Sequence, residues 1–158
     1  ALCMLPHLLT ASKKLLQVKE PIRILTATSG DTGKAALCGF QDVEGTEICV
    51  FYPHGGVSQV QRAQMITQEG NNVSVCAVEG NFDDAQSGVK KIFTDKSIAE
   101  KLAANSMAFS SANSINWGRL CPQIVYYFSA YCDMLCDSCP PPNQRYTLQG
   151  IRCRRPSW

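Results

Sequence analysis

Residues 25–36 read Leu-Thr-Ala-Thr-Ser-Gly-Asp-Thr-Gly-Lys-Ala-Ala, which is the pattern of a strand end, a turn and a helix start. Its Ser-Gly-Asp-Thr-Gly turn joins an apolar run at 22–27 to a helical pattern at 33–40. In an open parallel sheet, the loop between the end of a buried strand and the next helix is where ligands bind. The stretch therefore predicts both an α/β fold and the place of a binding site.

The rest of the chain continues the alternation of apolar runs and helical patterns. Strands are predicted at 47–52, 73–78 and 107–110, and helices at 58–68, 83–93, 97–105 and 117–134. The strands are continuously apolar, as expected when helices cover both faces of a parallel sheet. We therefore expect an α/β domain with an open, mostly parallel sheet and helices on both faces.

Composition changes sharply near the end of the chain. We expect an α/β domain at 1–136 and a disordered or foreign tail at 137–158, since three successive prolines at 140–142 cannot continue a helix. Four of the fifteen basic residues and one of the thirteen acidic residues lie in this tail. No interleaving of basic and aromatic residues extends into the domain, so we expect no nucleic-acid partner.

The nine cysteines bear on the compartment and on metal binding. Most stand singly in apolar stretches, as Cys49 and Cys76 do, which is typical of reduced thiols in a cytoplasmic protein. Only Cys136 and Cys139 have the close spacing of a zinc pair, and a zinc ribbon needs two such pairs. We expect no metal site, and a zinc-binding tail remains the alternative.

Neither a membrane span nor a signal peptide is expected. No apolar run approaches the roughly 18 residues of a membrane-spanning helix. Residues 1–12 have no basic leader followed by an apolar core, so no signal peptide is expected. Because the chain starts at Ala1 without Met, we also expect that its natural beginning lies further upstream.

The Ser-Gly-Asp-Thr-Gly turn has the chemistry of an anion site. Gly30 and Gly33 allow a tight turn and a close approach of the backbone to a ligand. The N–H groups of Thr32 and Gly33, with the Ser29 and Thr32 hydroxyls, are expected to point from a helix N-terminus toward an anion. Asp31 adds an acceptor that suits a phenolic oxygen better than a phosphate. A capped helix without any ligand is the alternative.

Several other chemistries are disfavoured. A nucleotide-binding P-loop needs glycine and a hydroxyl residue where this chain has Thr28 and Ala35. No Gly-x-Ser-x-Gly elbow is present, so a serine hydrolase has no support. Asp83 and Asp84 would point about 100° apart on a helix and are expected to favour its N-terminus rather than chelate a metal.

A second polar loop, at 110–119, reads Ser-Ser-Ala-Asn-Ser-Ile-Asn-Trp-Gly-Arg. Arg119 can bind a phosphate or carboxylate through two hydrogen bonds, and Asn113 and Asn116 can orient a ligand. The alternative is that serine and asparagine serve only the turn and the helix cap, with Arg119 a surface charge.

Together these motifs resemble the threonine synthase family in its bacterial and fungal form. The resemblance rests on TATSGDTGKAAL at 26–37, VFYPHGGVSQVQRAQM at 50–65, GNFDDAQSGVKKIF at 80–93 and SSANSINWGRLCPQIVYYFSAY at 110–131. These motifs stand in the family's order and cover roughly residues 5–135. Animal threonine-synthase-like proteins share the resemblance.

The resemblance implies a fold-type-II pyridoxal-phosphate enzyme that converts O-phosphohomoserine and water to threonine and phosphate. This chain would be its smaller, mobile α/β domain, with residues 29–33 beside the cofactor and the substrate carboxylate. Asn113, Ser114, Asn116 and Arg119 would bind substrate from the opposite rim. The family's Schiff-base lysine would lie upstream of this chain and its glycine-rich phosphate loop downstream, so we expect no catalytic residue here and no activity from the chain alone.

Two alternatives remain open at this stage. One is a non-catalytic α/β module that binds a small anionic metabolite, and the other is a threonine-synthase-like phospholyase. Dehydratases of the same fold are also relatives, but the Asn-Ser-Ile-Asn-x-x-Arg pattern favours threonine synthase over them.

Overall fold

The computed structural model describes residues 1–137, and residues 138–158 lie outside the described part. The tail expected at 137–158 falls almost entirely in that second range, so its character stays a prediction. The chain divides into two compact units, Ala1–Pro122 and Gln123–Trp158, which are described separately.

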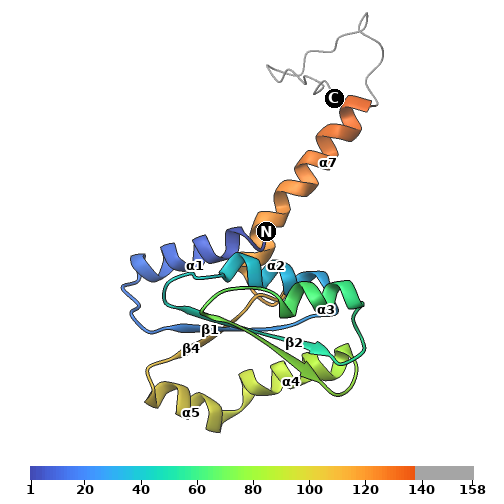
Figure 1. Cartoon of the computed structure of the whole chain (residues 1–158). Coiled ribbons are helices and arrows are strands. Elements are labelled where there is room, and N and C mark those ends of the chain that lie inside the picture. The colour runs from blue at the N-terminus through green and yellow to red at the C-terminus, as the bar shows by residue number, and fades with distance from the viewer. Residues whose placement is uncertain (138–158) are drawn as a thin grey trace, which may run out of the picture. The chain divides into compact units, whose positions relative to one another are not determined.

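The first unit is built on a four-stranded sheet in the order β3-β2-β1-β4 (Figure 1). All three strand pairs are parallel, which confirms the predicted fold class. The strands are β1 (Ile22–Ala27), β2 (Thr46–Pro53), β3 (Val73–Val78) and β4 (Ala108–Ser111). Each lies within a residue or two of its predicted range.

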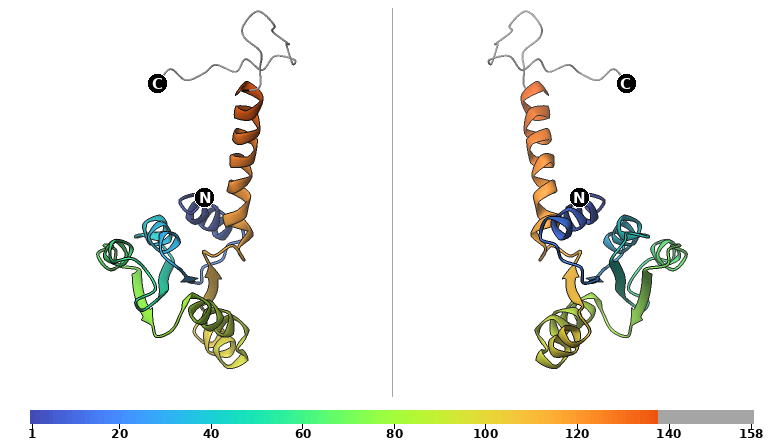
Figure 2. Two further views of the ribbon diagram at one scale, coloured as in Figure 1. Left: turned by 90° about the vertical axis from the view of Figure 1, so that its right-hand side faces the viewer. Right: turned by 90° about the vertical axis from the view of Figure 1, so that its left-hand side faces the viewer.

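Helices cover both faces of this sheet (Figures 1 and 2). One face carries α1 (Met4–Leu15), α2 (Asp31–Phe40) and α3 (Gln59–Ile66), and the other carries α4 (Phe82–Thr94) and α5 (Lys96–Ala104). Sequence analysis missed α1, whose first turn supplies the buried Leu5 to the core. The fold is therefore a three-layer α/β arrangement.

Two apolar clusters hold the layers together, one on each face of the sheet. The larger contains Leu37 and Phe40 of α2, Val50 of β2 and Met65 of α3, all fully buried. Each side chain of this size contributes roughly 1.5–3 kcal/mol when it is removed from water. The smaller cluster packs Val89 and its neighbours on α4 against the opposite face.

Two helices begin at side-chain caps. Ser58 begins α3 through a capping box with Gln61, and Asn81 begins α4 through a capping box with Asp84. The Asp84 carboxylate accepts a hydrogen bond from the Asn81 N–H at 2.8 Å, so it serves the helix start as expected.

The long helix predicted at 117–134 is wrong in one respect, because it is interrupted. Residues Trp117–Leu120 form the short helix α6, Cys121–Gln123 form a 3-10 turn, and α7 runs over Ile124–Asp137. Pro122 stands at the interruption, where it has no N–H to donate and its ring crowds the preceding turn. Among the described residues, no helix has both the length and the hydropathy that a membrane crossing requires.

Candidate functional site

The Ser-Gly-Asp-Thr-Gly turn is organised by the buried side chain of Thr28, which directly follows β1. Its Oγ1 accepts hydrogen bonds from the N–H groups of Gly30 at 3.0 Å and Gly33 at 2.9 Å. The same hydroxyl donates to the Gly30 carbonyl at 3.1 Å. The Gly33 N–H was expected to face a ligand, but it is already bonded inside the protein.

The two glycines of the turn are required by packing inside the protein. A Cβ on Gly30, whose φ is +150°, would lie 2.3 Å from Nε2 of Gln61. A Cβ on Gly33 would lie 2.6 Å from Sδ of Met65 and 2.7 Å from Cγ2 of Thr28. The sequence predicted that both glycines allow a tight turn and the approach of a ligand. The structure adds a packing reason, since both glycines let neighbouring side chains approach the turn, while the approach of a ligand stays a prediction.

Other groups of the turn remain open to a ligand. Ser29 and Asp31 are exposed and Thr32 is half-buried at the N-terminus of α2. Within residues 1–137, the N–H groups of Asp31 and Thr32 have no hydrogen-bond acceptor. Unpaired N–H groups at the positive end of a helix dipole attract an anion.

Asp31 is held in place by α3. Its Oδ1 accepts a hydrogen bond from Nε2 of Gln61 at 2.9 Å. Gln61 is fixed in turn, because its Oε1 accepts from the Ser58 N–H at 3.1 Å in the capping box. The carboxylate therefore has one defined position beside the open N–H groups.

The second polar loop lies directly beside this turn. Asn113 pairs its side chain with the backbone of Ala27, the last residue of β1: its Nδ2 donates to the Ala27 carbonyl at 2.8 Å, and its Oδ1 accepts from the Ala27 N–H at 3.0 Å. Because β1 and β4 are parallel neighbours, both loops leave the sheet at the same edge. The structure thus brings the two predicted stretches together.

The other polar residues of the second loop mainly shape it. Asn116 donates to the Ser111 carbonyl at 2.8 Å, and its Oδ1 accepts from the Gly118 N–H at 2.9 Å as the cap of α6. Ser114 is exposed. The structure therefore supports the alternative role in turn and cap for Asn116, while its contact with a ligand stays a prediction.

Arg119 is anchored at one end of its guanidinium. Its Nη1 donates to the Ala112 carbonyl at 2.8 Å, while Nε has no hydrogen-bond partner among the described residues. Partial burial lowers the pKa of the guanidinium, but an arginine keeps its charge at neutral pH. A guanidinium with donors left over can form charge-assisted hydrogen bonds to a phosphate or carboxylate, and whether Arg119 does so stays a prediction.

No family model matches this chain. The chain is 45% identical to human Threonine synthase-like 1 over 118 residues, and 45% identical to threonine synthase of Pseudomonas aeruginosa over 111 residues. It is homologous to part of a threonine synthase.

Solved structures of the threonine synthase family agree with this relation. The PLP-bound enzyme from Brucella melitensis aligns over 89% of this chain with 38% identity and a TM-score of 0.65, and the Escherichia coli enzyme over 80% with 35% identity and the same TM-score. The chain spans only 16% of human Threonine synthase-like 1, 23% of the Pseudomonas enzyme and 29% of the Brucella structure. This chain therefore spans less than a third of the length of each of these three relatives.

Two residues of the site were missed from sequence. From sequence, Thr28 was noted only because it stands where a P-loop needs glycine. A buried hydroxyl at the end of a strand is nevertheless well placed to form hydrogen bonds with the next turn. Gln61 could have been identified as a capping-box residue from Ser58-x-x-Gln61. Its bond to Asp31, across 30 positions of sequence, gives no local signal.

Two pockets of this threonine synthase homologue lie near the amino ends of the strands, opposite the Ser-Gly-Asp-Thr-Gly turn. One of about 430 Å³ is lined by residues such as Thr46 and Asn72, and another of about 620 Å³ lies between the end of α1 and Gly45. Neither includes the Ser-Gly-Asp-Thr-Gly turn, which is an open surface of this chain. Within residues 1–137, no group of three or more His, Cys, Asp or Glu side chains lies close enough together to share one metal ion.

Proposed function

We propose that this chain is the part of a threonine synthase that binds anionic substrate at the carboxyl edge of its small domain. The full-length parent would use pyridoxal phosphate to convert O-phosphohomoserine and water to threonine and phosphate, in the cytoplasm and without nucleic-acid or membrane partners. The observation that carries the proposal is the double hydrogen bond between Asn113 and Ala27, which joins two motifs shared with the family.

The residues at this edge fit a cofactor that carries a ring hydroxyl and an anionic substrate. Ser29, Thr32 and the open N–H groups of the turn are donors, and Asp31 is an acceptor that would lie near the cofactor's ring oxygen. Pyridoxal phosphate supplies an electron sink for the reacting carbon atoms. This chain's residues would bind and orient the substrate, and Arg119 would hold its phosphate or carboxylate from the opposite rim.

The lysine that carries the cofactor is expected outside this chain. Lys34 is the lysine nearest the turn in sequence, but its ammonium group is hydrogen-bonded to Oε1 of Gln68. That contact engages Lys34 away from the open N–H groups of Asp31 and Thr32. We therefore expect the chain alone to be inactive.

A chimera tests the proposal directly. The segment of Escherichia coli threonine synthase that matches this chain would be replaced by this chain's residues, and phosphate release from O-phosphohomoserine would be measured. We expect activity, and a fall in kcat/KM of about 30-fold in Arg119→Ala, because a charge-assisted hydrogen bond contributes about 2 kcal/mol. The matched control is Arg23→Ala, which removes an arginine paired with Glu47 near the opposite end of β1.

Two results would contradict the proposal. A chimera that folds and binds cofactor but releases no phosphate would show that these loops do not serve this substrate. Equal losses in Arg119→Ala and Arg23→Ala would show that the second loop makes no contact of its own with the substrate.

A second candidate is supported by the 45% identity to human Threonine synthase-like 1, which equals the identity to the Pseudomonas enzyme. The parent would then be a phospholyase that releases phosphate without forming threonine. Quantifying both products of the chimera distinguishes the two. A non-catalytic module would instead bind phosphorylated amino acids as the isolated chain. Calorimetric titration would then show binding that is lost in Arg119→Ala, because the guanidinium is the proposed anion ligand.

A further inference from the structure

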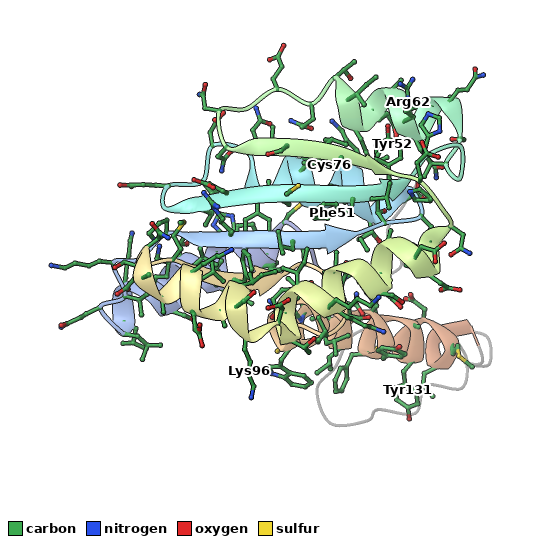
Figure 3. The ribbon with its side chains drawn as sticks, turned by 90° about the horizontal axis from the view of Figure 1, so that it is seen from below. Phe51, Tyr52, Arg62, Cys76, Lys96 and Tyr131 are labelled. Carbon is green, nitrogen blue, oxygen red and sulfur yellow. The ribbon has the colours of Figure 1, made fainter. Side chains whose placement is uncertain are left out.

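Cys49 and Cys76 form a close thiol pair on neighbouring strands. Their Sγ atoms are 3.8 Å apart, although the residues are 27 positions apart in sequence. Both side chains lie on the α4 side of the sheet, and α4 packs on β1 and β2. Figure 3 shows Cys76 on β3 beside Phe51 on β2. Cys76 is exposed and Cys49 is half-buried, so the pair is open to solvent from one side.

Strand register argues against a disulfide between these two residues. The Cα partner of Cys49 is Ser74, and the partner of Cys76 is Phe51, so the two cysteines are diagonal neighbours. Parallel strands lie about 4.8 Å apart with a rise of about 3.3 Å per residue, so residues that are diagonal by two positions have Cα atoms roughly 8 Å apart. A disulfide normally requires Cα atoms within about 7 Å and a sulfur–sulfur bond of about 2.05 Å. The backbone would have to move to close this pair.

A bridging metal ion fits the same geometry without that movement. Two metal–sulfur bonds of about 2.3 Å span sulfur atoms up to about 4.6 Å apart. Zinc normally takes four ligands, and no third His, Cys, Asp or Glu joins the pair within residues 1–137. A soft ion that accepts two thiolates does not need a third ligand, and Cu(I) is among the metals that soft thiolate ligands favour.

We infer that Cys49 and Cys76 form a two-thiolate binding site for a soft metal ion of the Cu(I) class. One ion forms two metal–sulfur bonds, both S–H bonds break, and two protons leave to solvent. No electron is transferred. The site involves neither polar loop, so the inference stands independently of the proposed function.

Ion binding at this pair is coupled to loss of the thiol protons, because the thiolate and not the thiol is the metal ligand. A bound cation removes the repulsion between the two sulfurs and favours loss of both protons.

Competition for Cu(I) tests the inference. The full chain would be titrated without oxygen against a chromophoric Cu(I) chelator, in a background with Cys136→Ser and Cys139→Ser because those residues are also close in sequence. We expect one ion per chain, and an affinity about 100-fold or more weaker in Cys49→Ser and in Cys76→Ser, because a single thiolate loses the chelate effect. Cys38→Ser, at an exposed cysteine of α2, should change nothing.

The test remains interpretable if one of the two single variants fails to fold. Cys76→Ser alters an exposed side chain on an edge strand, so it reports on the site even if Cys49→Ser does not fold. X-ray absorption should show two sulfur neighbours around the ion. Full affinity in both single variants, or an equal loss in Cys38→Ser, would overturn the inference. So would a Cys49–Cys76 disulfide formed by mild peroxide in a chain that takes up no Cu(I).

Discussion

Replacing Gly33 by alanine distinguishes two reasons for the glycine. If it only admits a ligand, alanine should stabilise the free chain, because alanine is better than glycine in a helix by about 1 kcal/mol. In the structure the added methyl meets Met65, Thr28 and Val50 at 2.6–3.0 Å, and all three side chains are buried. Overpacking of this kind costs about 1–3 kcal/mol. After the helix gain of about 1 kcal/mol is subtracted, we expect Gly33→Ala to lower the free energy of unfolding by up to about 2 kcal/mol, and not to raise it.

The matched control is Gly88→Ala in the middle of α4. A methyl group there meets nothing within 4 Å, so only the helix gain applies and stability should rise by about 0.5–1 kcal/mol. Urea unfolding followed by circular dichroism measures both variants, and the dependence on urea should be unchanged in each. An equal rise in stability in Gly33→Ala and Gly88→Ala would refute the packing argument. The approach of a ligand would then be the better explanation for Gly33.

Three further predictions concern single side chains. Thr28→Val should destabilise the chain by about 1–3 kcal/mol in urea unfolding, because the buried Gly30 N–H loses its acceptor, while Thr28→Ser retains the hydroxyl and most of the stability. Asn113→Ala should abolish phosphate release by the chimera while thermal unfolding still shows one cooperative transition; unchanged activity would contradict the role of this residue in joining the loops. Asp95 accepts hydrogen bonds from Ser97 and Ile98, which lower the pKa of its carboxyl in the folded chain, so this cap should stabilise α5 above about pH 4 and be lost as the pH falls further. Amide chemical shifts of α5 measure that loss, and Asp95→Asn should remove the pH dependence.

Sequence patterns located most of the elements because their causes are local. Continuous apolar runs mark the four strands, and Ser58 and Asn81 mark two helix starts by hydrogen bonds that span three residues. Prediction was less successful where a local pattern was weak or was broken. The first helix was missed, and the apolar pattern beyond Trp117 concealed the break at Pro122.

For the candidate site, the sequence showed which residue types stand at the ends of β1 and β4, but not how their polar groups are used. The Gly33 amide is bonded to Thr28, and the Asn113 amide group is bonded to Ala27. The sequence analysis expected both groups to bind a ligand. A polar group that bonds to its own protein and one that bonds to a substrate cannot be told apart from residue type alone. Whether the open groups of residues 29–33 and Arg119 contact ligand stays a prediction.

By itself the sequence determined the parallel α/β class, the order of the elements and the two loops that follow neighbouring strands, since hydrophobic periodicity and capping act over a few residues. Only the tertiary structure decided which distant groups meet. The pairing of Asn113 with Ala27, of Gln61 with Asp31 and of Cys49 with Cys76 spans 27 to 86 positions. Such contacts depend on strand register and on helix packing, because a shift of one residue in either would turn the side chains away from each other.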